Sequence, residues 1–355
     1  MRTVGVEEEF LLVDASGHPV GVAGAAADGI LVELELKEQM LETGTPPSHD
    51  ARELAEHLGH RRRAAALAAR DAGARLVALA TSPRPVTSSV TAKRRYQHIV
   101  SEFGLTAREQ LTCGCHVHVE VADADEGVAV LDRIGPWLPS LLALSANSPF
   151  WQGEDTGYAS YRSQVWQRWP TAGPTDTFGD PATYAAVVDG LIASGAALDA
   201  GMVYFDARLS RRYPTVEVRV ADVCLRPQDA LLVALLARAL VETAARATLE
   251  VGPAIGHRAE LLRAATWRAG RSGLDGPLLH PLTLSEGDAC EVVEALLAQL
   301  RPVLVEQGEW DLANDLWSRL RVRGTGASEQ RAWARDGFAA VLRRAGDATL
   351  GAQPG

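Results

Sequence analysis

Three segments of this chain alternate between valine-rich apolar positions and polar positions, in the pattern typical of β-strands. They are residues 4–13, 113–121 and 215–220. Because successive side chains point to opposite faces of a strand, Glu7 shares a face with Glu9. In the same way His116, His118 and Glu120 share a face of the second strand. One polar row is usually a solvated sheet face, but three rows favour a single sheet with a packed back and a ligand-bearing front.

The third segment adds a pair of opposite charges, because Glu217 and Arg219 lie on one face of that strand. Glu8 departs from the pattern of the first segment, since it falls on the apolar side with Val6 and Phe10. We therefore expect either a β-bulge at Glu8 or a position for Glu8 at the rim of the sheet.

Helical patterns occupy much of the remaining chain and predict an α+β protein. Asp50, followed three residues later by Glu53, resembles a helix start, and this helix should continue to Gly73. Further helices are expected over residues 93–103, 126–144, 181–194, 227–247 and most of the last hundred residues, with extended segments over 30–36 and 75–80. We expect one catalytic domain over residues 1–350 and a frayed tail over 351–355.

Charge and composition limit the classes of partner. The chain of 355 residues carries a formal net charge of −10, so no basic field would attract nucleic acid or an anionic membrane. The arginine run Arg61, Arg62 and Arg63 lies inside a predicted helix and is expected to form one solvated face. The longest apolar stretches, residues 137–146 and 230–237, are shorter than a membrane span. We therefore expect small-molecule partners, with no nucleic acid and no membrane.

The cysteines bear on the compartment. Cys113, Cys115, Cys224 and Cys290 include no Cys-x-x-Cys pair and suggest no disulfide framework. Arg2 leads directly into the first predicted strand, so we expect no signal peptide. Both observations predict a reduced, cytoplasmic protein.

The charged rows supply candidate metal ligands in which oxygen predominates. These are Glu7, Glu9, Glu42, His116 and Glu217. Such a set suits Mg²⁺ or Mn²⁺ better than zinc, whose sites rely more on histidine and cysteine. Crowded carboxylates would repel one another unless cations lay between them. A site with two or more such ions normally serves phosphate transfer.

The chain lacks the usual phosphate-binding loops. Its only lysines are Lys37 and Lys93, neither of which stands in a Walker A motif, and no Gly-x-Gly-x-x-Gly run is present. If the protein handles ATP, metal ions and arginines must hold the phosphates. The best candidates are Arg219, Arg208 and Arg162.

Several short motifs follow one another in a recognisable order. They are Gly5-Val6-Glu7-Glu8-Glu9, Glu42 in Leu-Glu-Thr, Arg95-Tyr96, residues 113–119 (Cys-Gly-Cys-His-Val-His-Val), residues 143–149 (Ala-Leu-Ser-Ala-Asn-Ser-Pro) and residues 214–219 (Pro-Thr-Val-Glu-Val-Arg). Together they resemble the bacterial carboxylate-amine ligases of the glutamate-cysteine ligase type 2 family, from Val4 to about Ala332. One departure is Thr81-Ser82-Pro83, where many relatives have His-Pro-Phe after a threonine.

The resemblance implies a glutamine-synthetase-like fold, in which a curved antiparallel sheet forms an active-site funnel for ATP and Mg²⁺ and helices pack on its back. It implies that the oxygen-rich set named above binds the metal ions or adjoins them. It gives Glu217 and Arg219 catalytic roles, and it places Arg208 and Arg219 on the ATP phosphates. Arg162 becomes a candidate clamp for a substrate carboxylate. The residues left without a role are His118, Arg95 and Tyr96.

The implied reaction is ATP-dependent amide formation. A substrate carboxylate would attack the γ-phosphate of ATP, and an amine would capture the resulting acyl phosphate. The resemblance implies amino-acid substrates, with weak activity on glutamate and cysteine, and a homo-oligomer, most simply a dimer. The aromatic segment 147–177 is then either a cover that excludes water from the acyl phosphate or part of the core.

Two other functions are compatible with parts of the pattern. His-x-His on a strand also occurs in metal-dependent hydrolases that do not use ATP, but glutamates outnumber histidines in this set. The chain could instead be a non-catalytic nucleotide-binding relative. The intact acidic residues at positions 7, 9, 42 and 217 argue against that alternative.

Overall fold

The computed structural model describes residues 1–27, 31–251 and 257–351. The strands are β1 Val4–Val13, β2 Glu33–Leu34, β3 Met40–Gly44, β4 Arg75–Val77, β5 Gly114–Glu120, β6 Phe150–Trp151, β7 Glu154–Asp155, β8 Ala207–Leu209, β9 Thr215–Asp222, β10 Leu278–Leu279 and β11 Glu286–Gly287. The α-helices are α1 Ala23–Ala26, α2 Ala51–Asp71, α3 Arg94–Glu109, α4 Ala124–Ile134, α5 Leu138–Ser145, α6 Tyr161–Trp166, α7 Pro181–Ala193, α8 Pro227–Val251, α9 Ala259–Ser272, α10 Ala289–Glu306, α11 Trp310–Arg323, α12 Gly326–Ala334 and α13 Phe338–Thr349. Two short 3₁₀ helices are η1 Gly135–Trp137 and η2 Ala200–Met202.

One antiparallel sheet organises the molecule. Its strands follow the order β2-β3-β1-β5-β9-β8, and β4 also pairs with β1. The three strands predicted from the alternating pattern, β1, β5 and β9, are therefore direct neighbours. This arrangement confirms the expected fold class, an α+β protein built on a large antiparallel sheet with helices on its back.

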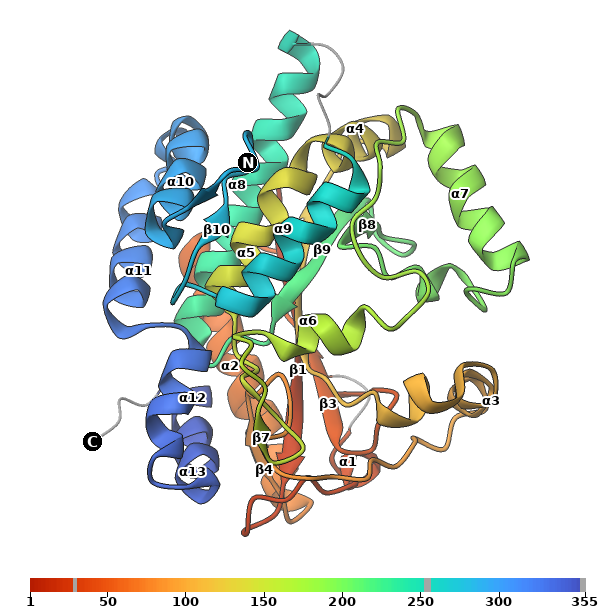
Figure 1. The fold of residues 1–355 in the computed structure, drawn as a ribbon, viewed down its shortest axis with the longest axis vertical. Coiled ribbons are helices and arrows are strands. Elements are labelled where there is room, and N and C mark those ends of the chain that lie inside the picture. The colour runs from red at the N-terminus through yellow and green to blue at the C-terminus, as the bar shows by residue number, and fades with distance from the viewer. Residues whose placement is uncertain (28–30, 252–256, 352–355) are drawn as a thin grey trace.

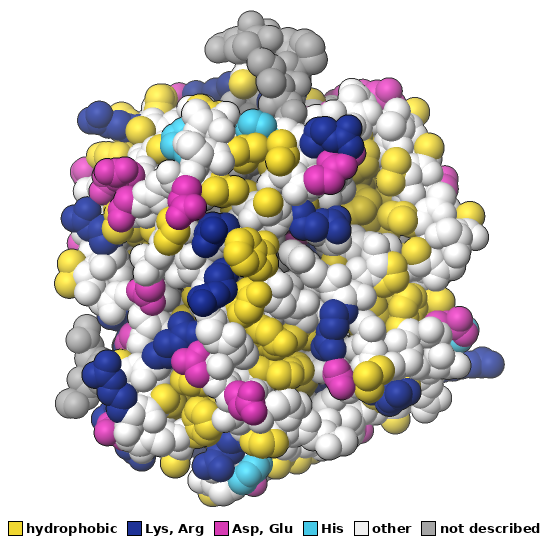
Figure 2. Space-filling model, viewed as in Figure 1, with side chains coloured by type: hydrophobic (Ala, Val, Ile, Leu, Met, Phe, Trp, Pro, Cys, Tyr) yellow, Lys and Arg dark blue, Asp and Glu magenta, His cyan; other side chains and the backbone are white. Residues whose placement is uncertain are grey.

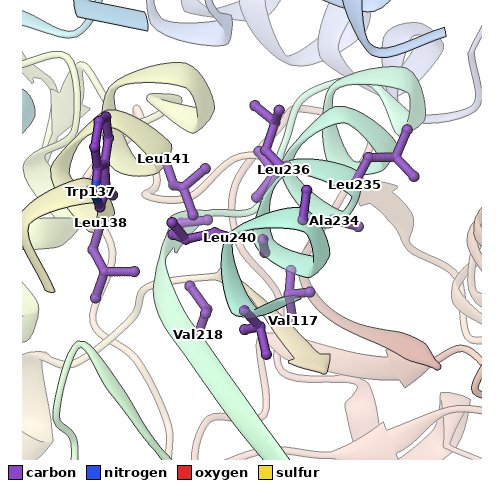
Figure 3. Close-up of a cluster of buried hydrophobic side chains, with 14 of the residues drawn as sticks. Val117, Trp137, Leu138, Leu141, Val218, Ala234, Leu235, Leu236 and Leu240 are labelled. Carbon is purple, nitrogen blue, oxygen red and sulfur yellow. The ribbon is translucent and has the colours of Figure 1, made fainter. Parts of the chain in front are cut away.

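The back of the sheet is the main hydrophobic core. Val117 of β5 lies opposite Val218 of β9, and both valines are buried. Figure 3 shows them packed with Leu141 of α5 and Leu240 of α8. Removing these side chains from water supplies the dominant stabilising free energy of such a layer, which fixes the sheet in one orientation.

A small apolar cluster lies beyond the other face of the sheet. It joins Ile99 of α3, Trp169 just after α6 and Met202 of η2. Figure 1 shows α3 and α7 on the opposite side of the molecule from α10 and α11, with α6 between them. These elements form the walls around the front of the sheet, where the polar rows lie.

Glu8 is neither bulged nor at the rim, so that expectation is wrong. β1 continues in register through Glu8 on both sides, and the Glu8 side chain is buried on the back of the sheet. Arg62 of α2 donates hydrogen bonds from Nε and Nη2 to its two carboxylate oxygens, at 2.9 and 2.5 Å. The expectation that Arg61, Arg62 and Arg63 form one solvated face is also wrong, because Arg62 is 1% exposed.

The helix expected over residues 126–144 is two α-helices, α4 and α5, separated by η1. Pro136 explains the break, because proline lacks an N–H and its ring clashes inside a helix.

Among the described residues, the run Ala124–Ser145 is long and apolar enough to cross a membrane by length and composition, which corrects the expectation of shorter apolar stretches. However, 72% of its apolar 18-residue window is buried, so it has the surroundings of a core helix.

Most of the other expected elements are present with shifted ends. Asp50 caps α2 by accepting hydrogen bonds from the backbone N–H groups of Arg52 and Glu53, as its sequence pattern predicted. The strand expected over residues 75–80 is shorter, ending at Val77. Of the predicted tail 351–355, only Gly351 lies within the described residues. The single domain over residues 1–350 stays a prediction.

Candidate active site

The polar rows of neighbouring strands meet on the front of the sheet because the strand register aligns them. Glu7 lies opposite His116, and His118 lies opposite Glu217. Glu9 lies opposite Glu42 on the other side of β1. Directly opposed residues in an antiparallel pair have Cβ atoms about 4.5–5.5 Å apart, so these side chains are held together by the backbone alone.

Two groups of potential metal ligands result, and both contain Glu7. Glu7, Glu42 and His116 form the first cluster, and Glu7, His118 and Glu217 form the second. Within each cluster the ligand atoms lie within 4.8 Å of one another. A Glu7 carboxylate oxygen is 3.6 Å from Nδ1 of His116, and its other oxygen is 3.3 Å from Nε2 of His118. Glu7 therefore links the two clusters.

The pKa values of the two histidines are shifted in opposite directions. Burial and the positive charge of Arg219 lower the pKa of His116 to about 4, so its imidazole is neutral at pH 7. Burial also disfavours the charged form of His118, but the carboxylate of Glu7 outweighs that effect and raises the pKa of His118. Burial opposes the ionised form of Glu7, yet its contacts with both histidines lower its pKa. A neutral imidazole is the form that binds a metal ion, and His116 has it.

Acidic side chains crowd the other end of the first cluster. Burial, followed by the charge of Glu35, raises the pKa of Glu42 well above its ordinary value, and Glu35 also hydrogen-bonds the Glu42 side chain. The same two causes raise the pKa of Glu9 to about 7. The Glu9 carboxylate accepts a hydrogen bond from the backbone N–H of Gly114 and belongs to neither cluster. These carboxyl groups need protons or cations to coexist.

The first cluster fits a divalent cation. It combines two carboxylates with a neutral imidazole, a donor set suited to Mg²⁺ or Mn²⁺. Nε2 of His116 is buried without a hydrogen-bond partner among the described residues, and a cation would offset the burial and the charge of Glu35 that raise the pKa of Glu42. The second cluster is less open to an ion, because Glu217 already faces two arginines.

Arg208 and Arg219 both form ion pairs with Glu217. Arg208 donates from Nε and Nη2 to the Glu217 carboxylate at 2.7 and 3.1 Å, and Arg219 donates from Nη1. Burial opposes the negative charge of Glu217, but Arg219 and Arg208 together lower its pKa. Nη1 of Arg208 also donates to the carbonyl oxygens of Gly201 and Val203, so one of its five N–H groups has no hydrogen-bond partner within the described part of the chain.

Arg219 has more unused donor capacity. Its Nε is buried without a hydrogen-bond partner among the described residues, and its guanidinium group lies 5.7 Å from the ring centroid of Trp166 and 5.8 Å from that of Tyr204. Of the two arginines predicted to bind phosphate, Arg219 can therefore offer more hydrogen bonds to a ligand.

Arg162 enters the front of the sheet from the first turn of α6. Its Nη1 donates to the carbonyl oxygen of Val220 at 3.3 Å and its Nη2 to that of Arg219 at 3.4 Å, while Nε lacks a hydrogen-bond partner among the described residues. A Cβ atom at Gly114 would collide with Nη2 of Arg162, so a larger residue there would force Arg162 to move. The guanidinium group of Arg162 is thus partly occupied by hydrogen bonds to the backbone of β9.

The aromatic segment divides between two places. Trp166 lies beside Arg162 and Arg219 at the front of the sheet, and Trp169 packs on Phe103 of α3. Tyr158 instead packs on Tyr161, and its hydroxyl accepts a hydrogen bond from Nε1 of Trp267 of α9 at 3.3 Å. Of these three side chains, Trp166 is therefore the one that covers the arginines of the candidate site.

The candidate site includes three residues to which the sequence assigned no function, namely His118, Glu35 and Tyr204. His118 was visible in the motif, and its strand position predicted its face but not its contact with Glu7. Glu35 follows the two-residue strand β2, which is too short to show an alternating pattern. Arg95, also without a role from the sequence, pairs with Asp199 through hydrogen bonds of 3.1 Å.

Comparisons with known sequences agree over almost the whole chain. Residues 3–339 match the family described as glutamate-cysteine ligase family 2. A candidate glutamate-cysteine ligase 2-1 from Streptomyces avermitilis is 52% identical over 340 residues, which cover 93% of this chain and 94% of the relative. A candidate glutamate-cysteine ligase 2-2 from Frankia alni is 51% identical over 362 residues, covering 95% of this chain and 94% of the relative.

Solved structures with low sequence identity share the fold. A bifunctional glutathione synthetase from Pasteurella multocida superposes with a TM-score of 0.71 at 16% identity and covers 99% of this chain, which spans 52% of that protein. A glutamate-cysteine ligase from Francisella tularensis, crystallised with AMP, has a TM-score of 0.69 at 14% identity, with coverage of 98% of this chain and 89% of that one. At such identities the likeness concerns the fold alone.

Proposed function

This chain belongs to glutamate-cysteine ligase family 2, and we propose that it is an ATP-dependent ligase that joins the carboxylate of one amino acid to the amine of another through an acyl phosphate. The observation that carries the proposal is the pair of carboxylate and histidine clusters that share Glu7 on the front of the sheet. Arg208 and Arg219 provide positive charge beside them.

The reaction needs two displacements. An oxygen of the donor carboxylate forms a bond to the γ-phosphorus of ATP, and the bond from that phosphorus to the β–γ bridging oxygen breaks, so ADP leaves. The amine then attacks the acyl carbon, inorganic phosphate leaves with the electrons of the C–O bond, and the nitrogen loses a proton. Charge develops mainly on phosphoryl oxygens, so positioning and electrostatic stabilisation account for most of the catalysis.

The chain divides these tasks among the residues on the front of the sheet. Glu7, Glu42 and His116 would hold a divalent cation, which supplies positive charge to the ATP phosphates when bound. Arg219 donates to the transferring phosphoryl group from the N–H groups that Glu217 does not occupy. Glu217 keeps Arg219 and Arg208 charged and oriented, and so acts as a positioning residue.

Other residues would bind the donor and exclude water. Arg162 would contact a carboxylate of the donor through Nε, the nitrogen that lacks a partner. Trp166 and Tyr204 have ring centroids 4.8 Å apart and cover the guanidinium groups with apolar surface. Such a cover limits hydrolysis of an acyl phosphate before the amine arrives.

The alternatives are less well supported. Among the described residues, the two clusters are the groups that could hold a metal ion, and each contains one histidine and two glutamates. A zinc hydrolase relies on a set of ligands that is richer in histidine. A non-catalytic relative would have no need for a buried excess of acidic groups with raised pKa values. Amide or phosphoester hydrolysis without ATP would revive the first alternative, and nucleotide binding without ADP release would support the second.

The proposal is tested by incubating the purified protein with Mg-ATP, L-glutamate and a pooled set of amino acids. ADP release that depends on both amino acids, with an adduct one water lighter than their sum in mass spectrometry, is the expected result. The control omits ATP.

A homodimer and a cytoplasmic location stay predictions. Helix α7 is apolar with no buried residue, a surface that a second copy could cover, and size-exclusion chromatography with light scattering tests this.

A further inference from the structure

The Arg95-Tyr96 motif lies on the first half of α3, residues 94–103, and none of the roles above uses it. Side chains of this half belong to the apolar cluster that also contains Trp166 and Tyr204. Those two rings lie over the guanidinium group of Arg219. The first half of α3 therefore packs on the aromatic cover of the candidate active site.

This half of α3 is weakly attached to the rest of the fold. Of residues 94–103, all of which the structure describes, Ile99 alone is buried. Figure 2 shows Lys, Arg, Asp and Glu side chains at the lower right of the surface, where α3 lies in Figure 1. A segment with few buried apolar side chains has a low local stability, so it can separate from its neighbours at small cost.

The second half of α3 is held more firmly. The buried Lys37 donates to the carbonyl oxygen of Arg108 at 2.8 Å, and Oγ of Ser88 donates to the same oxygen at 2.9 Å. A cation at this end of a helix also interacts favourably with the helix dipole. Arg168, just after α6, forms an ion pair with Glu109 at 2.7 Å. Movement of α3 would therefore be confined to its first half.

Gly104 separates the two halves. Its φ of 54° and ψ of −122° interrupt the helix, and residues with a side chain rarely adopt such a positive φ. A Cβ atom at Gly104 would meet no atom of a neighbouring segment within 4 Å, so packing does not require glycine there. The glycine instead gives the backbone a point at which changes of φ and ψ can turn one half of the helix against the other.

Arg95 joins the first half of α3 to the opposite wall of the site. Its Nε and Nη2 donate to the two carboxylate oxygens of Asp199, both at 3.1 Å. Asp199 also accepts from the N–H of Gly201 at 2.8 Å, and the carbonyl oxygen of Gly201 accepts from Nη1 of Arg208 at 3.1 Å. Two parallel hydrogen bonds give the geometry in which an exposed ion pair is strongest. The pair thus links α3 to the arginine that contacts Glu217.

We propose that residues 94–103 form a lid that turns at Gly104 and is held closed over the site by the Arg95–Asp199 ion pair. With the lid open, water attacks the carbonyl carbon of the acyl phosphate and inorganic phosphate leaves. The donor returns as a free carboxylate with release of a proton, so ATP is cleaved without amide formation. This inference rests on the proposed function and adds to it the device that protects the intermediate. Arg95 and Asp199 are positioning residues.

The test compares wild type with Arg95→Gln and Asp199→Asn, which keeps an oxygen to accept from Gly201. Hydrogen–deuterium exchange of the free protein should be roughly 3-fold faster over residues 94–103 in each variant and unchanged over residues 105–109, because an exposed ion pair changes an equilibrium by a few-fold. With Mg-ATP, L-glutamate and L-cysteine, the excess of ADP over amide should rise roughly 3-fold above that of wild type.

Arg94→Gln is the matched control, since it removes the same charge from the exposed neighbouring position on α3 and should leave both quantities unchanged. Unchanged exchange over residues 94–103, equally faster exchange in both halves of α3, or a wild-type ratio of ADP to amide in the two variants would each overturn the inference. Absence of amide with wild type would count against the proposed function, whereas the exchange measurement would still decide whether the ion pair holds the lid.

Discussion

Glu7 of β1 and His116 of β5 occupy opposed positions in the sheet, and a Glu7 carboxylate oxygen lies 3.6 Å from Nδ1 of His116. The same carboxylate approaches His118, the partner of Glu217 on the next strand. One side chain therefore belongs to both candidate metal clusters, and its removal should have the widest effect in the site.

Glu7→Gln should lower ATP turnover by roughly 10²-fold or more, and by more than Glu42→Gln, because it disturbs both clusters. The measurement is ADP release at saturating ATP over a titration of Mg²⁺. Glu56→Gln is the control, since that glutamate is exposed on α2, and it should leave the Mg²⁺ dependence unchanged. Wild-type turnover in Glu7→Gln would contradict the metal assignment.

The buried ion pair of Glu8 and Arg62 should matter for stability instead. Removing one partner leaves an uncompensated charge, which typically costs about 3–5 kcal/mol. Arg62→Met should destabilise the protein more than Glu8→Gln does, because Arg62 also donates to the carbonyl oxygens of Cys224, Leu225 and Thr349. Urea unfolding measures both variants. A loss below about 1 kcal/mol in each would show that the pair is not important to the fold.

Gly114→Ala should reduce ligase turnover by roughly 10-fold or more with little loss of fold. Its Cβ would collide with the guanidinium group of Arg162, so that group must leave its position against β9. Gly5→Ala is the control, because a Cβ there lies 3.9 Å from the nearest atom, the carbonyl oxygen of Thr45. Equal activity of the two variants would show that the position of Arg162 is unimportant.

Glu9 predicts a pH dependence of stability in the presence of EDTA. Its folded-state pKa is raised to about 7 from an ordinary value of 4.5, so the stability contributed by its proton is complete below pH 4.5 and is lost as the pH rises through 7. The free energy of unfolding of wild type, relative to Glu9→Gln, should fall by on the order of 3 kcal/mol between pH 4.5 and 8. Parallel stability curves for the two proteins would refute this.

The alternation of valine with charged residues was enough to predict β1, β5 and β9 and the face on which each charged side chain lies. It works because one face must be buried, which fixes the register. Glu8 was misjudged because its partner Arg62 is distant in sequence, and no local pattern marks a buried ion pair. Lys37 stands in no phosphate-binding motif, and its side chain is buried and donates a hydrogen bond to the carbonyl oxygen of Arg108 at 2.8 Å.

The site was predicted less completely than the sheet. Glu35 comes from a segment with no periodicity, and Tyr204 lies in the short loop between η2 and β8. Their positions depend on how loops cross the front of the sheet, and on packing among the neighbouring helices. Such tertiary contacts set which polar groups face one another, and they leave no regular spacing in the sequence.

The identity of the nucleotide product tests the central claim most directly. Wild-type protein is incubated with Mg-ATP, L-glutamate and L-cysteine, and the products are followed by phosphorus NMR. The proposed acyl-phosphate reaction predicts ADP and inorganic phosphate in equal amounts, formed together with the amide. AMP with pyrophosphate, or amide formation without ATP cleavage, would contradict it.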